Sequence, residues 1–313
     1  MSQLHICLFG EFRLAYNDGL DTVSATHTTQ ALLAYLLLLP HRPQPREVVA
    51  EAFWGDRNQE RARSCLKTAL WRLRSLLEPK GTPPGTYVLA GPNGDIGFNW
   101  ESNYWLDVTA FEQSTRRVLA LPPDRMQPKD AQTLKAAIEL YAGELLEGFY
   151  DDWVLRERER FRQIYLDSLA HLLRFCRRHG AYSEALDCGR KILELDPLRE
   201  EIHRELMHLY LETGQRSLAI KQFEVCRDLL STELGILPMD ETQALYRQIA
   251  PELDNLERDL MTKAGGVDTD LALRQLRVTL HSLDKVHDQL WQTIQLMEQV
   301  EPHRTDAQHQ SPH

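Results

Sequence analysis

The sequence predicts a mostly α-helical protein with a small α+β unit at its amino-terminal end. Strand-like segments flank three helical patterns within the first 106 residues. From residue 107 the apolar spacing is helical almost throughout, and one motif recurs after 34 residues. A narrow apolar seam near the carboxyl end predicts a coiled-coil-like helix. We therefore expect four parts, namely residues 1–106, 107–253, 254–301 and a disordered tail at 302–313.

Length and composition indicate a soluble globular protein of two or three domains. The 313 residues include 36 basic and 46 acidic side chains, which give a net charge of −10. The longest apolar run, residues 31–39, is about half of what a bilayer crossing needs, and the polar start of the chain does not resemble a signal peptide. Five widely spaced cysteines suggest neither a disulfide framework nor a metal site. We expect a cytoplasmic protein with reduced thiols and no membrane segment.

A β-hairpin is expected to open the chain. β-forming residues alternate with other residues over residues 5–16, as is typical of a strand. The turn signal Asn17-Asp18-Gly19 follows, before a second short strand at residues 20–23. We therefore expect the two strands to meet at this turn.

Two helices are expected after the hairpin. Threonines around residue 28 offer N-caps to a helix through residues 31–39, which Pro40 stops. Pro45 suits a first helical turn, so residues 46–53 are expected to form a second helix that ends at a glycine.

The third predicted helix, residues 61–77, has five cations and no acid, although the whole chain is acidic. At about 100° per residue, one side of this helix is apolar and the other is basic and hydrogen-bonding. A helix of this type fits a DNA major groove, where cations meet phosphates and polar side chains meet base edges. The alternative is an ordinary solvated helix. The candidate DNA-contacting residues are Arg61, Arg63, Ser64, Lys67, Thr68, Trp71, Arg72 and Arg74.

A second hairpin is expected after the basic helix. Residues 87–90 and 96–100 are strand-like and flank a tight tip that contains Asn93, a further candidate DNA contact. Three helices followed by a hairpin is the order of a winged helix, with the third helix as reader and the hairpin as wing. For Trp71 two alternatives stay open: it contacts DNA, or the wing or the preceding helix packs over it.

The second part of the chain is expected to be a helical repeat. Residues 180–186 recur as residues 214–220, with a glycine at each helix end and a small residue at each close helix contact. This is the period of tetratricopeptide repeats, which present concave surfaces to protein partners. The expected helices are residues 107–120, 130–142, 152–178, 183–195, 199–212 and 217–234.

Several motifs together resemble one known family. They are Leu8-Phe9-Gly10, Trp54-Gly55-Asp56, Leu70 to Arg74, Trp105-Leu106-Asp107-Val108 and Asp196-Pro197-Leu198-Arg199-Glu200, within a match over residues 4–249. The chain resembles regulators of the Streptomyces antibiotic regulatory protein type, in which a winged helix similar to that of OmpR precedes a bacterial transcriptional activator domain.

This resemblance implies an activator that binds promoter DNA through the helix at 61–77 and uses its helical domain for dimerisation and contact with RNA polymerase. Two positions depart from the family pattern. The first helix opens with Thr26-His27-Thr28-Thr29-Gln30 where the family usually has basic residues, and the wing tip has Asp95 and no cation. We therefore expect lighter phosphate anchoring than is typical of the family.

The carboxyl-terminal seam is the expected dimer contact. Its residues step by three and four for over three heptads, as the a and d positions of a coiled coil do. We expect pairing in a homodimer; folding back onto the repeat or binding another protein are the alternatives. After Leu273, the seam residues are Leu276, Leu280, Leu283, His287, Leu290, Ile294 and Met297.

No catalytic motif is visible. The sequence has no phosphate loop, nucleophile elbow or paired-histidine zinc motif, so we expect no enzyme, cofactor or metal site. His203 and His208 diverge on a helix and are interpreted as packing and capping residues. The Arg–Glu run at 156–160 is interpreted as a salt-bridged, solvated face. Two hypotheses remain: a transcription factor, or a helical scaffold whose winged helix does not bind DNA.

Overall fold

The structure of the chain is a computed structural model that describes residues 3–16, 25–38, 43–79, 81–91 and 94–251. Residues 1–239 belong to one compact unit and residues 240–313 to a second. The predicted fold class is confirmed, since helices dominate and a small sheet lies at the amino-terminal end. Within the described ranges, no helix has the length and apolar character to cross a membrane. Asn93, the predicted turn and strand at 17–23, the seam and the tail lie outside the described residues.

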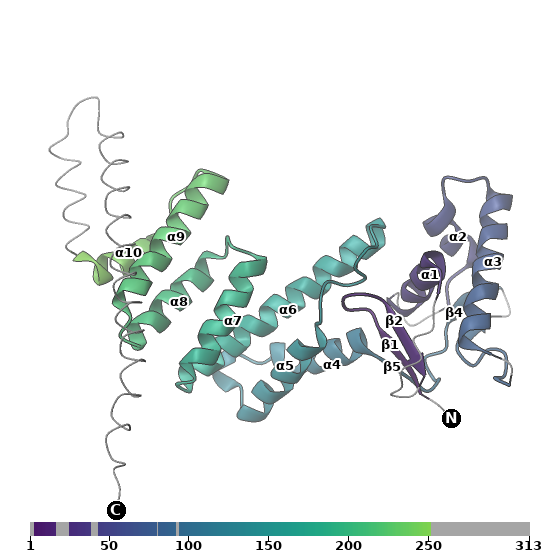
Figure 1. Cartoon of the computed structure of the whole chain (residues 1–313), viewed down its shortest axis with the longest axis horizontal. Coiled ribbons are helices and arrows are strands. Elements are labelled where there is room, and N and C mark those ends of the chain that lie inside the picture. Colours follow the sequence, from purple (N-terminus) through teal and green to yellow (C-terminus); the bar gives the residue numbers. More distant parts are fainter. Residues whose placement is uncertain (1–2, 17–24, 39–42, 80, 92–93, 252–313) are drawn as a thin grey trace, which may run out of the picture. The chain divides into compact units, whose positions relative to one another are not determined.

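A three-stranded sheet begins the fold. It consists of β1 (Leu4–Cys7), β2 (Arg13–Tyr16) and β5 (Tyr104–Leu106), in the order β2-β1-β5. β1 pairs antiparallel with β2 and parallel with β5, so the end of the predicted first domain returns to its start (Figure 1). No strand was expected at β5.

The prediction of one strand over residues 5–16 is wrong. The chain reverses between β1 and β2, where Gly10 has a positive φ of 73°. The amides of Leu8 and Phe9 donate to the side chain of Asp107 and not to a neighbouring strand. A contact with a residue about a hundred positions later therefore determines where this hairpin turns.

Three helices and a two-stranded ribbon follow, in the predicted order. They are α1 (His27–Leu38), α2 (Arg46–Trp54), α3 (Gln59–Leu77), β3 (Val88–Ala90) and β4 (Ile96–Phe98). Asn58 caps α3, because its Oδ1 accepts a hydrogen bond from the amide of Arg61 at 2.9 Å. The predicted apolar side of α3 is confirmed, with buried residues Ala62, Leu66, Ala69, Leu70, Leu73 and Leu77.

The ribbon is attached to the helices at both of its strands. Glu78, just after α3, accepts hydrogen bonds from the amides of Tyr87 (2.9 Å) and Val88 (3.0 Å). Gln44, just before α2, exchanges two backbone hydrogen bonds with Ile96 of β4, at 2.7 and 2.8 Å. The position of the ribbon relative to α3 is therefore determined by these backbone contacts.

The rest of the first unit is helical and confirms the predicted repeat. Gly180 and Gly214, with φ of 73° and 75°, follow α6 and α8, and Ala185 and Ala219 are fully buried. The short helix α10 (Asp240–Ile249) belongs to the second unit. The other elements are α4 (Asp107–Leu119), the 3₁₀ helix η1 (Pro123–Arg125), α5 (Pro128–Leu140), α6 (Asp152–Arg178), α7 (Tyr182–Leu195), α8 (Glu200–Glu212) and α9 (Arg216–Leu234).

One hydrophobic core is continuous across the predicted domain boundary at residue 106. Phe9, from the turn after β1, lies 5.3 Å from Phe111 of α4 and 5.4 Å from Phe161 of α6, measured between ring centroids. The backbone of the same turn pairs with the loop after α5, where the amide of Gly10 donates to the carbonyl of Glu144 at 2.8 Å. The sheet and the helical region therefore share their interior.

The interpretation of residues 156–160 as a salt-bridged, solvated face is wrong at Arg158 and holds at Arg160, whose side chain is 39% exposed and forms two ion pairs. Arg158 is 13% exposed and donates to the carbonyl oxygens of Leu145, Leu146 and Phe149 at 2.8 to 3.0 Å. Arg160 pairs with Glu112 of α4 and with Glu157, and its guanidinium lies over an aromatic ring. Both arginines therefore bind the start of α6 to neighbouring elements.

Candidate nucleic-acid interface

The outward side of α3 is left open by the fold. Lys67 and Arg72 are exposed and, among the described residues, form no hydrogen bond or ion pair within the chain. Arg74 is partly buried, and its Nε has no hydrogen-bond partner among those residues. The exposed candidates on α3 are Arg61, Arg63, Ser64, Lys67, Thr68, Trp71 and Arg72. Eight of the nine sequence candidates therefore lie on one helix, and seven of them are exposed.

Trp71 is 67% exposed at the centre of this side. The alternative that the wing or the preceding helix packs over its ring is therefore wrong for the described residues. A large apolar ring in this position adds an uncovered aromatic surface to a cationic helix face.

Three polar side chains on this side are already engaged within the protein. Arg63 pairs with Glu47 of α2 at 3.4 Å, with both side chains exposed. The hydroxyl of Thr68 donates to the carbonyl of Ser64, and the hydroxyl of Ser75 donates to the carbonyl of Trp71. An exposed pair of this kind contributes little stability, so Arg63 can exchange Glu47 for another anion at small cost.

A polar depression adjoins α3 and adds residues that sequence reasoning missed. Arg57, directly after α2, lies beside the helix and donates to the Sγ of Cys65 at 3.2 Å. Guanidinium and hydroxyl groups with a helix N-terminus nearby are the groups that bind backbone phosphates in protein–DNA complexes. The depression has a volume of about 330 Å³ and is lined by Thr28, Thr29, Trp54, Arg57, Ser64, Cys65, Thr68, Ala69 and Arg72.

The sequence contained one signal for this depression. Trp54-Gly55-Asp56 is one of the family motifs, whereas no sequence pattern marks the neighbouring Arg57 as a site residue. The start of α1 has no lysine or arginine, and Arg57 lines the same depression as Thr29 of that helix start. Thr28 and Trp54 line the same depression. Arg57 thus adds a cation to the depression near the start of α1, where the sequence of that helix has none.

The ribbon formed by β3 and β4 is compact at its described end. The amide of Gly91 donates to the carbonyl of Asp95 at 2.7 Å, and Gly94 has a positive φ of 83° that favours glycine. The segment from β3 to β4 contains no lysine or arginine. The ribbon therefore offers only backbone and polar groups, and no cation, to an anion.

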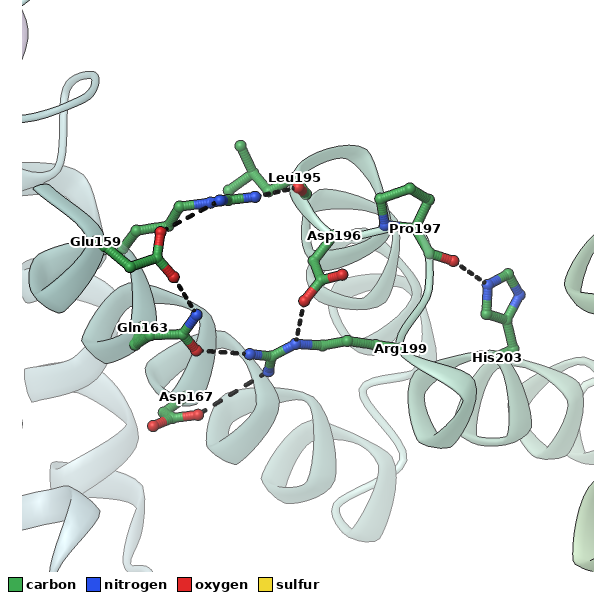
Figure 2. A network of polar contacts seen from close by, with 9 residues as sticks. Glu159, Gln163, Asp167, Leu195, Asp196, Pro197, Arg199 and His203 are labelled. Atoms are coloured by element: carbon green, nitrogen blue, oxygen red, sulfur yellow. Dashed lines mark hydrogen bonds and ion pairs between the residues drawn. The ribbon is translucent and has the colours of Figure 1, made fainter. Parts of the chain in front are cut away.

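The motif at residues 196–200 forms a polar network around the turn between α7 and α8 (Figure 2). Arg199 donates to Asp196 and to Gln163 of α6, each at 2.9 Å, and pairs with Asp167 at 3.9 Å. His203 donates from Nε2 to the carbonyl of Pro197 at 2.9 Å. These contacts tie the turn to α6, which indicates a structural role for this motif.

His203 is held in one tautomer. Its Nδ1 accepts a hydrogen bond from Gln222 of α9 at 2.6 Å, while its Nε2 donates to Pro197. Burial is the largest influence and lowers the pKa of His203 below its usual value. The interpretation of His203 as a packing residue is confirmed.

Comparison with known proteins relates this chain to transcriptional regulators. Residues 106–250 match the bacterial transcriptional activator domain. The regulatory protein AfsR of Streptomyces coelicolor is 26% identical over 237 residues, which are 75% of this chain and 23% of AfsR. The transcriptional regulatory protein EmbR of Mycobacterium tuberculosis is 25% identical over 283 residues, 87% of this chain and 70% of EmbR.

The chain is therefore similar to regulators of the Streptomyces antibiotic regulatory protein type. The chain spans only about a quarter of the length of AfsR. A solved structure of Mycobacterium tuberculosis EmbR, in complex with a low-affinity phosphopeptide, has the same fold, with a TM-score of 0.68 at 19% identity. That similarity covers 91% of this chain and 72% of the EmbR chain, so it extends over both the sheet region and the helical region.

Proposed function

We propose that this protein is a sequence-specific DNA-binding regulator of transcription that acts in the cytoplasm. α3 enters the major groove, and the depression beside α3 holds the phosphate backbone. The observation that supports this most strongly is the open side of α3, where Trp71 is exposed and Lys67 and Arg72 have no partner in the part of the chain that the structure describes. Groove-binding helices combine these same groups.

The charge distribution supports a site that depends on specific contacts. The net charge of the chain is −10, so its long-range field repels DNA, while the cations of α3 act at contact distance. Non-specific affinity is therefore expected to be weak, and base contacts and protein pairing supply most of the selectivity.

Activation is assigned to the helical region. The family match at 106–250 is to a transcriptional activator domain, and helix-hairpin repeats bind proteins through extended surfaces. We infer that this region contacts RNA polymerase. Residues 254–301 supply the homodimer contact through the seam predicted from their sequence. Two copies would then place two α3 helices on neighbouring half-sites.

The test is an electrophoretic shift with genomic DNA fragments that the intact protein selects in repeated rounds. The parent protein is expected to prefer a recovered fragment over bulk competitor DNA. Lys67→Glu and Arg72→Glu should abolish that preference, because each places a negative charge against the duplex. Lys191→Glu, an exposed charge reversal on α7, is the matched control and should bind as the parent does. A parent protein without any preferred fragment would favour the scaffold hypothesis.

A further inference from the structure

Trp71 is the only large apolar side chain of α3 that is exposed, and α3 is described over its full length. Other exposed apolar residues, such as Val48 and Tyr150, lie on other elements. A solvated indole at the centre of a cationic surface is unfavourable in the free protein. It becomes favourable only when a ligand covers the ring, so the ligand of α3 must present an apolar group at that point.

The residues around Trp71 indicate what kind of apolar group the ligand presents. Lys67 and Thr68 lie one turn before it, and Arg74 and Ser75 lie one turn after it. The hydroxyl protons of Thr68 and Ser75 are used in hydrogen bonds to carbonyls of α3 itself. The middle of the outward side therefore offers few hydroxyl donors to base edges, and its largest exposed surface is the apolar ring.

The major groove presents one apolar group on its base edges. This group is the C5-methyl of thymine, which lies next to the O4 acceptor of the same base. When a helix docks in the groove, cations toward its flanks meet phosphates and its centre meets base edges. Trp71 is large, exposed and central on this side of α3, so its ring is suited to contact the thymine methyl group.

We propose that Trp71 selects thymine by packing its indole ring against the C5-methyl group in the major groove. This inference rests on the proposed function, since it names the base chemistry that α3 reads. A duplex bound by this protein therefore contains a thymine at the base pair that faces the middle of α3. Packing of the ring against a deoxyribose or against another protein would not depend on that methyl group.

The experiment replaces each thymine of a selected duplex, one at a time, by deoxyuridine, which removes only the methyl group. For the parent protein, replacement at one or two neighbouring thymines should weaken binding about three- to fivefold each, as expected for the loss of one buried methyl group. For Trp71→Ala the same replacements should change affinity less than about twofold. Trp71→Phe, with a smaller ring, should show an intermediate penalty and serves as the comparison if the alanine variant binds too weakly to measure.

The matched control is Tyr150→Ala, because Tyr150 is an aromatic side chain that is 77% exposed and lies outside α3. This variant should lose as much affinity as the parent does when each thymine is replaced by deoxyuridine. Equal penalties in the parent and in the Trp71 variants, or no uracil-sensitive position in the parent, would overturn the thymine assignment while leaving DNA binding intact. Failure of the parent to select any duplex would instead remove the proposed function itself, so the two outcomes are distinguishable.

Discussion

The carboxylate of Asp107 accepts a hydrogen bond from the backbone amide of Leu8 at 2.8 Å, although 99 residues separate them in the chain. The same oxygen accepts from the amide of Phe9 at 2.9 Å, and the other oxygen accepts from the amide of Val108 at 2.7 Å. Burial raises the pKa of Asp107, while these amides and Arg13 oppose that rise. One carboxyl group thus connects the turn after β1 to the first residues of α4.

Replacement of Asp107 by asparagine is expected to destabilise the fold by about 1–3 kcal/mol, because the amide group offers one acceptor where three donors converge. The free energy of unfolding in urea would measure this change. Asp124→Asn, at an exposed position in η1, should change it by less than about 0.5 kcal/mol. Equal stability of the two variants would show that Asp107 does not hold the turn.

Arg158 gives a second stability prediction. Arg158→Ala leaves the carbonyls of Leu145, Leu146 and Phe149 without their donor, and Leu146 has a positive φ of 51° that this contact helps to maintain. We expect a loss of about 2–3 kcal/mol in thermal or urea unfolding.

Arg158→Lys should recover only part of that loss, because an ammonium group cannot reach three carbonyls as a planar guanidinium does. The control is Arg156→Ala, an exposed position on the same helix, with an expected change under about 0.5 kcal/mol. A loss in the control as large as in Arg158→Ala would contradict the role assigned to Arg158.

Arg57 is predicted to bind a phosphate rather than a base. Arg57→Gln should weaken binding to all duplexes by a similar factor and reduce the slope of log affinity against log salt by about one. Binding titrations from about 50 to 200 mM salt would measure this slope. Arg190→Gln, a charge removal at an exposed position on α7, should leave it unchanged. A change in sequence preference with Arg57→Gln, at constant slope, would mean that Arg57 contacts a base.

His203 should make stability depend on pH. Because burial lowers its folded-state pKa, the unfolded chain binds a proton first as pH falls below about 6.5. Its contribution to stability is therefore complete above that pH and is lost as pH falls toward the lowered pKa. In urea unfolding between pH 5 and 8, His203→Gln should show a shallower loss on acidification than the parent.

Some pH dependence of stability should remain in His203→Gln, because burial and Arg177 also lower the pKa of His208. A pH dependence equal to that of the parent would show that His203 does not stay neutral in the folded protein.

Local pattern was sufficient to predict most helices of the first unit. The buried and exposed sides of α3 follow from 3.6-residue periodicity, because each side chain's environment depends on its own helix. Gly180 and Gly214 were predictable as helix ends because a positive φ favours glycine. The sides and the ends of a helix are therefore determined by residues close together in the sequence.

Contacts between distant residues were not predictable in this way. β5 is only three residues long and forms because β1 offers a free edge, so no periodicity indicates it. The burial of Arg158 depends on carbonyls in a loop that the sequence leaves undefined. Arg57 becomes part of the candidate interface only when α1 and α3 are packed beside it. In each case the missing information was tertiary packing.

The shared interior has a practical consequence for anyone who wishes to isolate the amino-terminal region, residues 1–106. A polypeptide that stops at Leu106 would lose the packing partners of Phe9 on α4 and α6 and would leave that ring in water. It would also lack Asp107, the acceptor for the amides of Leu8 and Phe9. A fragment that keeps the ring contacts of Phe9 must therefore include Asp107, Phe111 and Phe161, and truncation at Leu106 is expected to expose Phe9 and reduce solubility.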